Sequence, residues 1–290
     1  MLGVGLIFFL AALQGATELF PVSSLGHAVV VPALLRFSFR QSDPAFVPVL
    51  TVLHLGTAAA LVVLYRAQWA RIVSGFVRAA VRGRVTGDDE RLAMMLVVGT
   101  IPAGLIGFFL ESPLKTLFAN PRLSAAFLVV NGGILLAAER VRRRDERRRH
   151  TSRADRRHPP GDPQYAPVEQ LTLRSALIVG LCQVGALLPG ISRSGVTMAA
   201  GLVAGLRHEE AARFSFLLAT PIILAAGLLE VPDLGPERPT AAIAAGAAAL
   251  AGVIAYASAR FLLRYLRVGR LDPFAFYCGA LGAAGLILIP

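Results

Sequence analysis

Residues 14–27 read QGATELFPVSSLGH and form a polar stretch between two apolar runs, residues 2–13 and residues 28–35. At a rise of about 1.5 Å per residue these runs reach only about 18 and 12 Å, whereas the hydrocarbon core of a bilayer is about 30 Å thick. Neither run crosses a membrane alone. We therefore expect a re-entrant pair of helices, which is tolerated where its broken backbone is buried in protein or lines a wet cavity.

A second polar stretch has the same setting. Residues 189–195 read PGISRSG and lie between two apolar runs, residues 176–188 and residues 196–206. These runs reach about 20 and 17 Å, again too short to cross. The sequence therefore predicts a second re-entrant pair.

The composition places both stretches in a membrane protein. Of the 290 residues, 55% are hydrophobic and only 16% are charged, and the mean hydropathy is +0.63. A soluble domain usually carries about 25% charged residues. Two isolated cysteines argue against a disulfide framework. The composition thus excludes an ordinary soluble enzyme and favours a polytopic membrane protein.

Six further segments have the length and apolarity of membrane helices. They are residues 44–65, 91–110, 123–139, 210–229, 240–263 and 273–290.

The arginine residues indicate an orientation. Arginine clusters follow the first, third and fifth of these segments, and the densest occupies residues 140–157. Basic loops next to membrane helices are usually cytoplasmic. One topology satisfies all three clusters: both termini lie outside, the first re-entrant pair enters from outside and the second enters from the cytoplasm.

The expected fold is an all-α integral membrane protein with an inverted-topology repeat, six transmembrane helices and two re-entrant helix pairs. Residues 1–139 form the first repeat, residues 140–170 a basic cytoplasmic loop and residues 171–290 the second repeat. Three membrane crossings separate the two re-entrant pairs. Because this number is odd, the second half has the opposite orientation in the membrane to the first. In such folds the broken helices meet near the midplane and hold a polar ligand.

The first polar stretch contains candidates for catalysis. Glu18 is a functional candidate because a carboxylate at membrane depth is costly unless it pairs or binds a cation; the alternative is a partly exposed interfacial position. Ser23 and Ser24 suit helix capping, yet Ser24 and His27 are spaced i, i+3 on one helix face and could pair as hydroxyl and base. A structural role for His27 stays open.

The second polar stretch suits an anion. Arg193 lies between Gly190 and Gly195, whose small size lets backbone N–H groups approach a ligand. A phosphate at the following helix N-terminus would also meet the side chains of Ser192, Ser194 and Thr197. The alternative for Arg193 is a structural salt bridge, for example to Glu18. His54 lies within the first full span, where a cavity position and a helix–helix hydrogen bond are equally compatible.

At these two stretches the chain resembles the undecaprenyl-pyrophosphate phosphatase family, the bacitracin-resistance integral membrane proteins. The family motifs are approximately EGxTEFLPVSSxGH and PGxSRSxxT, and here they stand as residues 14–27 and residues 189–197. The resemblance extends to residues 54–57, 101–103 and 214–218. It covers essentially the whole chain except the arginine-rich loop.

The resemblance implies an enzyme that removes the terminal phosphate of undecaprenyl pyrophosphate at the outer face of the bacterial plasma membrane. This reaction recycles the lipid carrier for peptidoglycan synthesis, and bacitracin competes for the same lipid. By position, Ser24 is the implied nucleophile, His27 the base or alternative nucleophile, Glu18 a metal or acid–base carboxylate and Arg193 the phosphate clamp. Ser192, Ser194, Thr197, Ser23 and Gln14 complete the implied pyrophosphate site.

One departure concerns the cofactor, a divalent cation such as Mg²⁺ or Ca²⁺. Gln14 stands where the family has its first glutamate, so Glu18 is left as the single carboxylate ligand. A single carboxylate holds Mg²⁺ weakly unless the phosphates of the substrate complete the shell.

Three other functions compare differently with the sequence. The inverted repeat and Gln14 also fit a translocase of undecaprenyl phosphate. A transporter of a soluble anion lacks a second buried charge for ion coupling. A membrane phosphatase with a Lys, Arg and two-His signature fits poorly, because Lys115 is the only lysine. The expected partners are membrane lipids, and not nucleic acid, because no aromatic residue interleaves the arginines. A homodimer is compatible with the sequence.

Overall fold

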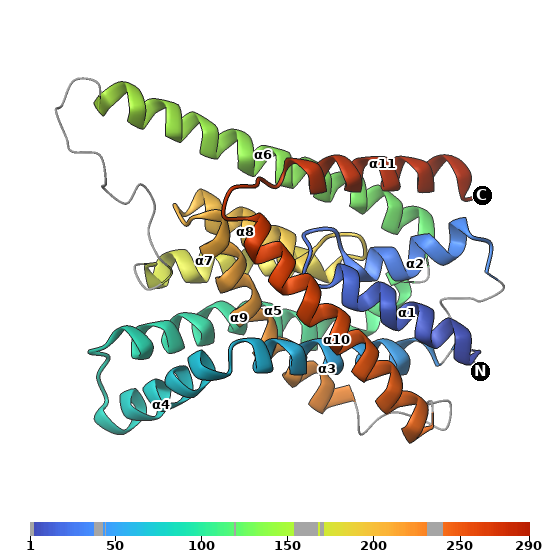
Figure 1. Cartoon of the computed structure of the whole chain (residues 1–290), viewed down its shortest axis with the longest axis horizontal. Coiled ribbons are helices and arrows are strands. Elements are labelled where there is room, and N and C mark those ends of the chain that lie inside the picture. The colour runs from blue at the N-terminus through green and yellow to red at the C-terminus, as the bar shows by residue number, and fades with distance from the viewer. Residues whose placement is uncertain are drawn as a thin grey trace.

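The computed structural model describes residues 3–37, 43, 45–118, 120–153, 168, 171–230 and 240–290. Within these ranges the chain is helical, with no strand (Figure 1). The helices are α1 (Val4–Thr17), α2 (Ser24–Leu34), α3 (Phe46–Leu64), α4 (Arg66–Arg82), α5 (Asp88–Phe118), α6 (Pro121–Arg153), α7 (Leu173–Val184), the short 3-10 helix η2 (Gly185–Leu187), α8 (Arg193–Val203), α9 (His208–Glu230), α10 (Ala241–Tyr265) and α11 (Asp272–Leu288).

Five of the described helices are long and apolar enough to cross a membrane: α3, α5, α6, α9 and α10. They correspond to five of the six expected spans. The sixth expected span, residues 273–290, forms the shorter apolar helix α11. Helices α1, α2 and α7 are also short: α1 ends and α2 begins within the first polar stretch, and α7, followed by η2, ends shortly before the second.

Two arginine-rich segments are helical where the sequence suggested loops. The arginines after the first span belong to α4, which packs against α5, where Gly75 brings the two backbones close together. The segment beginning at Arg140 continues α6 as far as Arg153. Arginine, glutamate and alanine are good helix formers, so charge alone did not end either helix. The rest of the expected basic loop, apart from residue 168, lies outside the described residues; it comprises residues 154–167, 169 and 170.

The helices of the two halves pack on each other in a reciprocal pattern (Figure 1). Helix α1 from the first half packs on α10 from the second, and α7 from the second half packs on α5 from the first. Both crossings depend on glycine, because a Cβ on Gly15 would lie 2.5 Å from the carbonyl oxygen of Ala251 and one on Gly180 would lie 2.3 Å from that of Gly99. Helix α6 pairs with α11, and α3 packs on both α9 and α10.

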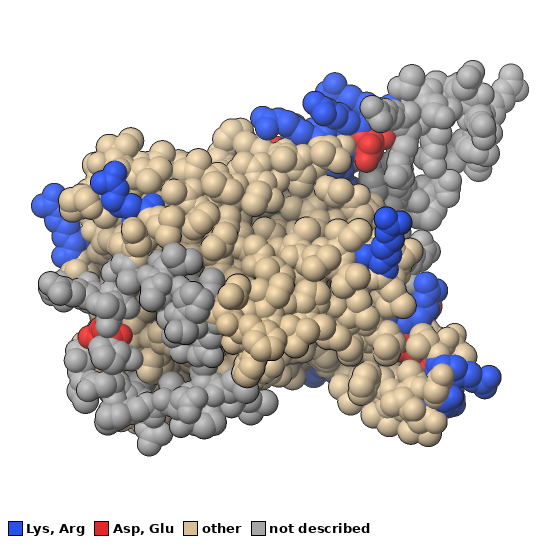
Figure 2. Space-filling model, turned by 180° about the vertical axis from the view of Figure 1, so that it is seen from behind, with Lys and Arg blue, Asp and Glu red and all other residues tan. Residues whose placement is uncertain are grey.

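The charged side chains gather at the edges of the molecule. Figure 2 shows a broad area without described charged side chains, with arginines toward its margins. Large apolar side chains such as Phe108, Phe109 and Val253 are exposed on the long helices. Such surfaces are rare on soluble monomers and suit contact with lipid.

Candidate active site

The two polar stretches meet inside the helical bundle. Asn131 of α6 is fully buried and joins them: its Nδ2 donates to the carbonyl oxygen of Pro21 over 2.9 Å, and its Oδ1 accepts from the backbone N–H of Ser192 over 3.0 Å. Gly190, with φ of 103°, lies where a Cβ would be 2.2 Å from the carbonyl oxygen of Ser124. The broken backbones are therefore buried in protein, as a membrane requires.

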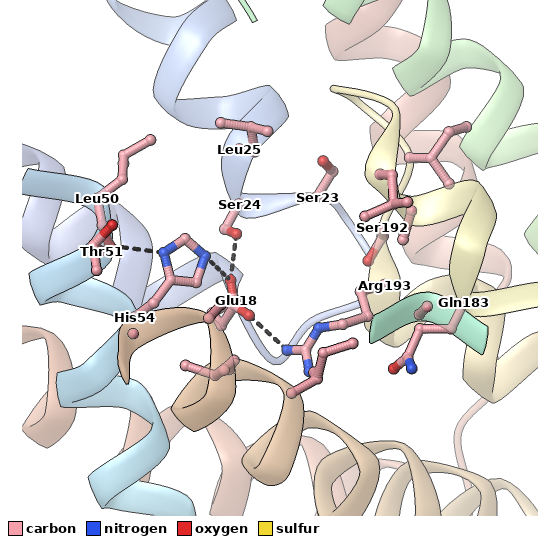
Figure 3. A pocket seen from close by; sticks show the side chains of 18 of the residues that line it. Glu18, Ser23, Ser24, Leu25, Leu50, Thr51, His54, Gln183, Ser192 and Arg193 are labelled. Carbon is pink, nitrogen blue, oxygen red and sulfur yellow. Dashed lines mark hydrogen bonds and ion pairs between the residues drawn. The ribbon is translucent and has the colours of Figure 1, made fainter. Parts of the chain in front are cut away.

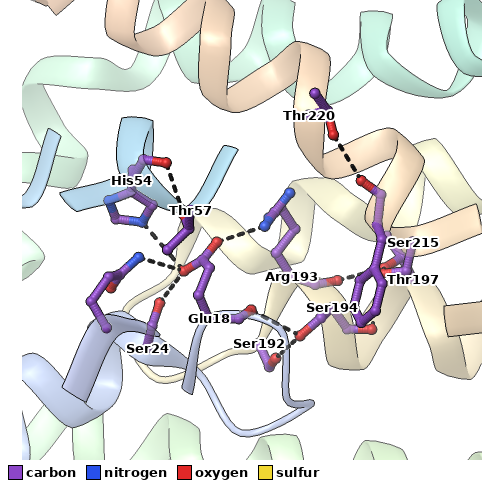
Figure 4. A network of polar contacts seen from close by, with 12 residues as sticks. Glu18, Ser24, His54, Thr57, Ser192, Arg193, Ser194, Thr197, Ser215 and Thr220 are labelled. Carbon is purple, nitrogen blue, oxygen red and sulfur yellow. Dashed lines mark hydrogen bonds and ion pairs between the residues drawn. The ribbon is translucent and has the colours of Figure 1, made fainter. Parts of the chain in front are cut away.

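Glu18 is the centre of the polar network (Figure 4). It follows the last residue of α1 and is 7% exposed. Its Oε1 accepts from Nη2 of Arg193 over 2.6 Å, and its Oε2 accepts from Nε2 of Gln14 over 2.9 Å and from the hydroxyl of Ser24. A buried carboxylate paired with a guanidinium and further donors is stable where an isolated one is not.

Ser24 and Arg193 each begin a helix. Ser24 is the first residue of α2 and Arg193 the first of α8, and the preceding serines cap these helices: the Oγ of Ser23 accepts from the N–H of Gly26, and that of Ser192 from the N–H of Gly195. Ser23 has φ of 67°, a conformation that costs of order 1–3 kcal/mol in a residue other than glycine. Two helix N-termini, which attract anions, thus converge on Glu18.

His54 joins the site from α3. Its Nε2 lies 3.4 Å from Oε2 of Glu18, and its Nδ1 lies 2.7 Å from the carbonyl oxygen of Leu50. The sequence left the position of His54 open between a cavity and a helix contact. In the structure it lines the cavity (Figure 3).

His27 lies in a different environment from the one expected. Its Nδ1 lies 2.7 Å from the carbonyl oxygen of Ser23 and its Nε2 lies 2.8 Å from the hydroxyl of Tyr277, whose ring stacks on the imidazole. The hydroxyl of Ser24 contacts Glu18 in place of His27. The i, i+3 spacing correctly placed Ser24 and His27 on the same helix, but the two side chains do not pair. No sequence pattern indicated that Tyr277, far along the chain, is the partner of His27.

The hydroxyl groups expected to bind phosphate are largely engaged with protein. Ser194 donates to the carbonyl oxygen of Phe20 over 2.7 Å, and Thr197 donates to the hydroxyl of Ser215 over 2.7 Å. Ser192 lines the cavity with Ser23, Ser24 and Arg193, whereas Ser194 and Thr197 are not among the lining residues. Ser194 therefore fastens the second stretch to the first, and Thr197 fastens α8 to α9.

The network opens on a cavity of about 310 Å³ (Figure 3). Its polar end is formed by Glu18, Ser23, Ser24, His54, Gln183, Ser192 and Arg193. Most of the remaining wall is apolar and comes from α3, α9, α5 and the α7–η2 segment, including Leu50, Ala103, Leu187, Ile222 and Ala226. A polar end and an apolar wall together fit a ligand with a charged head and a hydrocarbon tail.

The donor set for a divalent cation is small. Among the described residues no group of three or more His, Cys, Asp or Glu side chains is arranged to hold a metal ion. Within the described part of the chain, the candidate oxygen ligands are the carboxylate of Glu18, which lines the cavity, and the Oε1 of Gln14, which is buried behind Glu18 without a hydrogen-bond partner and is not among the lining residues. This set fits Mg²⁺ that arrives with the phosphates of a ligand, because Mg²⁺ commonly keeps such mixed shells.

Comparison with known proteins identifies the family. The family model described as bacitracin resistance protein BacA matches residues 7–284, which include both polar stretches. The chain belongs to this family. As a member with several long apolar helices, it is a multi-pass membrane protein.

Relatives from diverse bacteria share nearly the full length. The chain is 48% identical to the undecaprenyl-diphosphatase of Acidiphilium cryptum, over 97% of this chain and 96% of the relative. It is 46% identical to undecaprenyl-diphosphatase 2 of Burkholderia thailandensis, over 95% and 93%. It is 45% identical to the undecaprenyl-diphosphatase of Mycolicibacterium paratuberculosis, over 95% and 94%.

Proposed function

We propose that this protein hydrolyses undecaprenyl pyrophosphate to undecaprenyl phosphate and inorganic phosphate. The observation that carries the proposal is the cluster of Ser24, Glu18 and Arg193 at the polar end of a cavity with an apolar wall. The cluster supplies a hydroxyl nucleophile, a proton acceptor and a phosphate-binding cation, and the wall suits a prenyl chain. The names of the relatives support the same reaction.

The hydroxyl of Ser24 acts as the nucleophile. Because it donates to Oε2 of Glu18, its proton passes to that carboxylate as Oγ attacks the terminal phosphorus. A bond forms between Oγ and phosphorus, the bond from that phosphorus to the bridging oxygen breaks, and undecaprenyl phosphate leaves. Water then attacks the phosphoserine, the bond between Oγ and phosphorus breaks, and Glu18 returns its proton to Oγ, so that phosphate leaves and both the serine hydroxyl and the carboxylate are restored.

Positive charge around the cavity stabilises the transferred group. Arg193 and the N-termini of α2 and α8 converge on the place next to Ser24 where negative charge develops on the phosphoryl oxygens. Arg193 binds Glu18 in the absence of substrate, and this ion pair keeps both charges compensated until a phosphate arrives. His54 adds a positive charge when protonated and orients Glu18.

The carboxylate of Glu18 and the Oε1 of Gln14 are the groups that would hold Mg²⁺ or Ca²⁺. When bound, such a cation would neutralise charge on the two phosphates of the substrate. Because the protein supplies only one carboxylate, we expect the cation to bind more tightly in the presence of substrate than in its absence.

His27 acts as a positioning residue in this proposal. Both its backbone N–H and its Nδ1 contact the carbonyl oxygen of Ser23, and Tyr277 holds the imidazole from α11. These contacts fix the backbone immediately before the nucleophile.

The reciprocal packing supports an inverted repeat with two re-entrant pairs. The helices of the two halves correspond in chain order: α1, α2, α3, α5 and α6 match α7, α8, α9, α10 and α11. Under this correspondence, the contact between α1 and α10 is equivalent to the contact between α7 and α5. The pairs α3–α9 and α6–α11 map onto themselves. In this arrangement α11 is the counterpart of the spanning helix α6 and completes six crossings.

The location of the cavity supports an active site that faces the outside of the bacterial plasma membrane. The lining residues that α3 and α9 contribute come from the first half of α3 and the last part of α9. The arginines lie at the opposite ends, with Arg66 after α3 and Arg207 before α9. Since arginine-rich ends are usually cytoplasmic, the cavity belongs to the outer half.

Phosphate release from undecaprenyl pyrophosphate by the purified protein, with each of several divalent cations, tests the proposal. We expect release in the wild type and a loss of at least about 100-fold in Arg193→Ala, because the phosphate loses its charged ligand. No release with any cation, together with transbilayer movement of undecaprenyl phosphate in proteoliposomes, would overturn the proposal in favour of a translocase.

A further inference from the structure

Gln183 is a buried side chain at the cavity with no assigned role. It is 2% exposed, it lines the cavity, and neither its Oε1 nor its Nε2 has a hydrogen-bond partner in the described structure. A buried polar group without a partner costs about 1–3 kcal/mol, so such groups call for a ligand or water. The Nη1 of Arg193, at the same cavity, is also buried without a partner.

Gln14 shows why Gln183 lacks a protein partner. Each glutamine lies near the end of a short helix: Gln14 in α1, where the first polar stretch begins, and Gln183 in α7, shortly before the second. Gln14 donates to Glu18, four residues further along the chain. Four residues after Gln183 stands Leu187, which lines the cavity and offers no acceptor. The second repeat therefore keeps the amide and lacks the carboxylate that would occupy it.

The arrangement of the polar groups separates two positions for phosphate. Figure 3 shows the guanidinium of Arg193 between Glu18 and the amide of Gln183. Nη2 of Arg193 faces Glu18, beside the Ser24 hydroxyl, whereas Nη1 has no hydrogen-bond partner among the described residues. A pyrophosphate whose terminal phosphorus lies next to Ser24 extends its second phosphate away from the nucleophile, where free N–H donors are needed.

We propose that Gln183 and the Nη1 of Arg193 form the subsite for the lipid-linked phosphate, the one that remains on the carrier. The Nε2 of Gln183 donates to an oxygen of this phosphate, and its Oε1 accepts from a water in the cavity. This inference rests on the proposed phosphatase function.

Gln183→Met tests the subsite, because methionine has a similar shape and no N–H donor. With farnesyl pyrophosphate as the substrate, we expect KM to rise about tenfold, the loss typical of a hydrogen bond to a charged group, and kcat to change less. The inhibition constant of farnesyl phosphate should rise similarly, whereas that of orthophosphate should not. Gln183→Glu should raise KM further, because a carboxylate repels the phosphate.

Gln68→Met is the matched control. Gln68 is another buried glutamine with a partnerless Nε2, but it lies on α4 and is not among the lining residues of the cavity. We expect its KM to equal that of the wild type. A wild-type KM in both Gln183 variants, or equal changes in the Gln68 control, would overturn the inference while leaving the phosphatase intact. Absence of hydrolysis by the wild type would instead contradict the proposed function.

Discussion

Two of the roles proposed for Glu18, apart from cation binding, can be separated by a substitution. Glu18 accepts the hydrogen bond from Ser24, and it neutralises Arg193 in the absence of substrate. The first role belongs to the chemical step, whereas the second competes with substrate for the guanidinium. A neutral side chain of the same shape should therefore affect binding and turnover in opposite directions.

We predict that Glu18→Gln lowers kcat by about 100-fold or more, because the amide does not accept the serine proton at neutral pH. KM should stay level or fall, because Arg193 is released for the phosphate and a negative charge is removed. Steady-state kinetics with farnesyl pyrophosphate at saturating Mg²⁺ measure both constants. A raised KM with an unchanged kcat would assign Glu18 to binding alone.

Sequence reasoning found the residues whose type is unusual at membrane depth. Glu18 and Arg193 were identified because charges within apolar segments are costly, and the structure joins them in the ion pair considered beforehand. His54 stayed undecided, since one helix does not reveal which face meets a cavity. The partners of His27 depend on Tyr277 and on tertiary packing, which local spacing does not encode.

At the scale of elements, the two polar breaks between short helices control the site. Gly190 and Gly205 offer a matched pair of glycines with positive φ, 103° and 94°. A Cβ at Gly190 would lie 2.2 Å from the carbonyl oxygen of Ser124, whereas a Cβ at Gly205 would meet nothing within 4 Å. The two positions separate backbone conformation from steric contact.

Gly205→Ala should lower the free energy of unfolding by about 1–2 kcal/mol, the cost of the backbone conformation alone. Gly190→Ala should cost about 2–5 kcal/mol, because the new methyl group also clashes with α6. Thermal unfolding in detergent compares the two variants with the wild type. Equal shifts in Tm would show that the second break does not pack against α6 as described.

The sequence was informative about where helices break and less so about where they end. The two polar stretches and five of the spans were predicted from apolar run length. Helix α4 and the extension of α6 were missed, because arginine-rich segments were interpreted as loops although their residues favour helix.

At the scale of the whole molecule, the arginine-rich ends and the cavity lie on opposite sides, which predicts a definite orientation. We expect a cysteine introduced by Val81→Cys, at the exposed end of α4, to be cytoplasmic. One introduced by Pro290→Cys should be outside. Both are placed in a background carrying Cys182→Ala and Cys278→Ala.

A membrane-impermeant maleimide applied to intact spheroplasts measures this orientation. Labelling should occur at position 290 only, and at both positions after permeabilisation, which serves as the control. Labelling at position 81 alone in intact spheroplasts would reverse the proposed topology and place the cavity on the cytoplasmic side.

The most direct test of the account is turnover of a prenyl pyrophosphate labelled in its terminal phosphate, quenched with acid in one sample and with alkali in a second, because phosphoserine survives acid whereas phosphohistidine survives alkali. We predict that the label is recovered on Ser24, and that Ser24→Ala forms no labelled protein and loses at least about 1,000-fold in kcat while still binding substrate. Label on His27, or a Ser24→Ala variant with wild-type turnover, would contradict the assignment of Ser24 as the nucleophile.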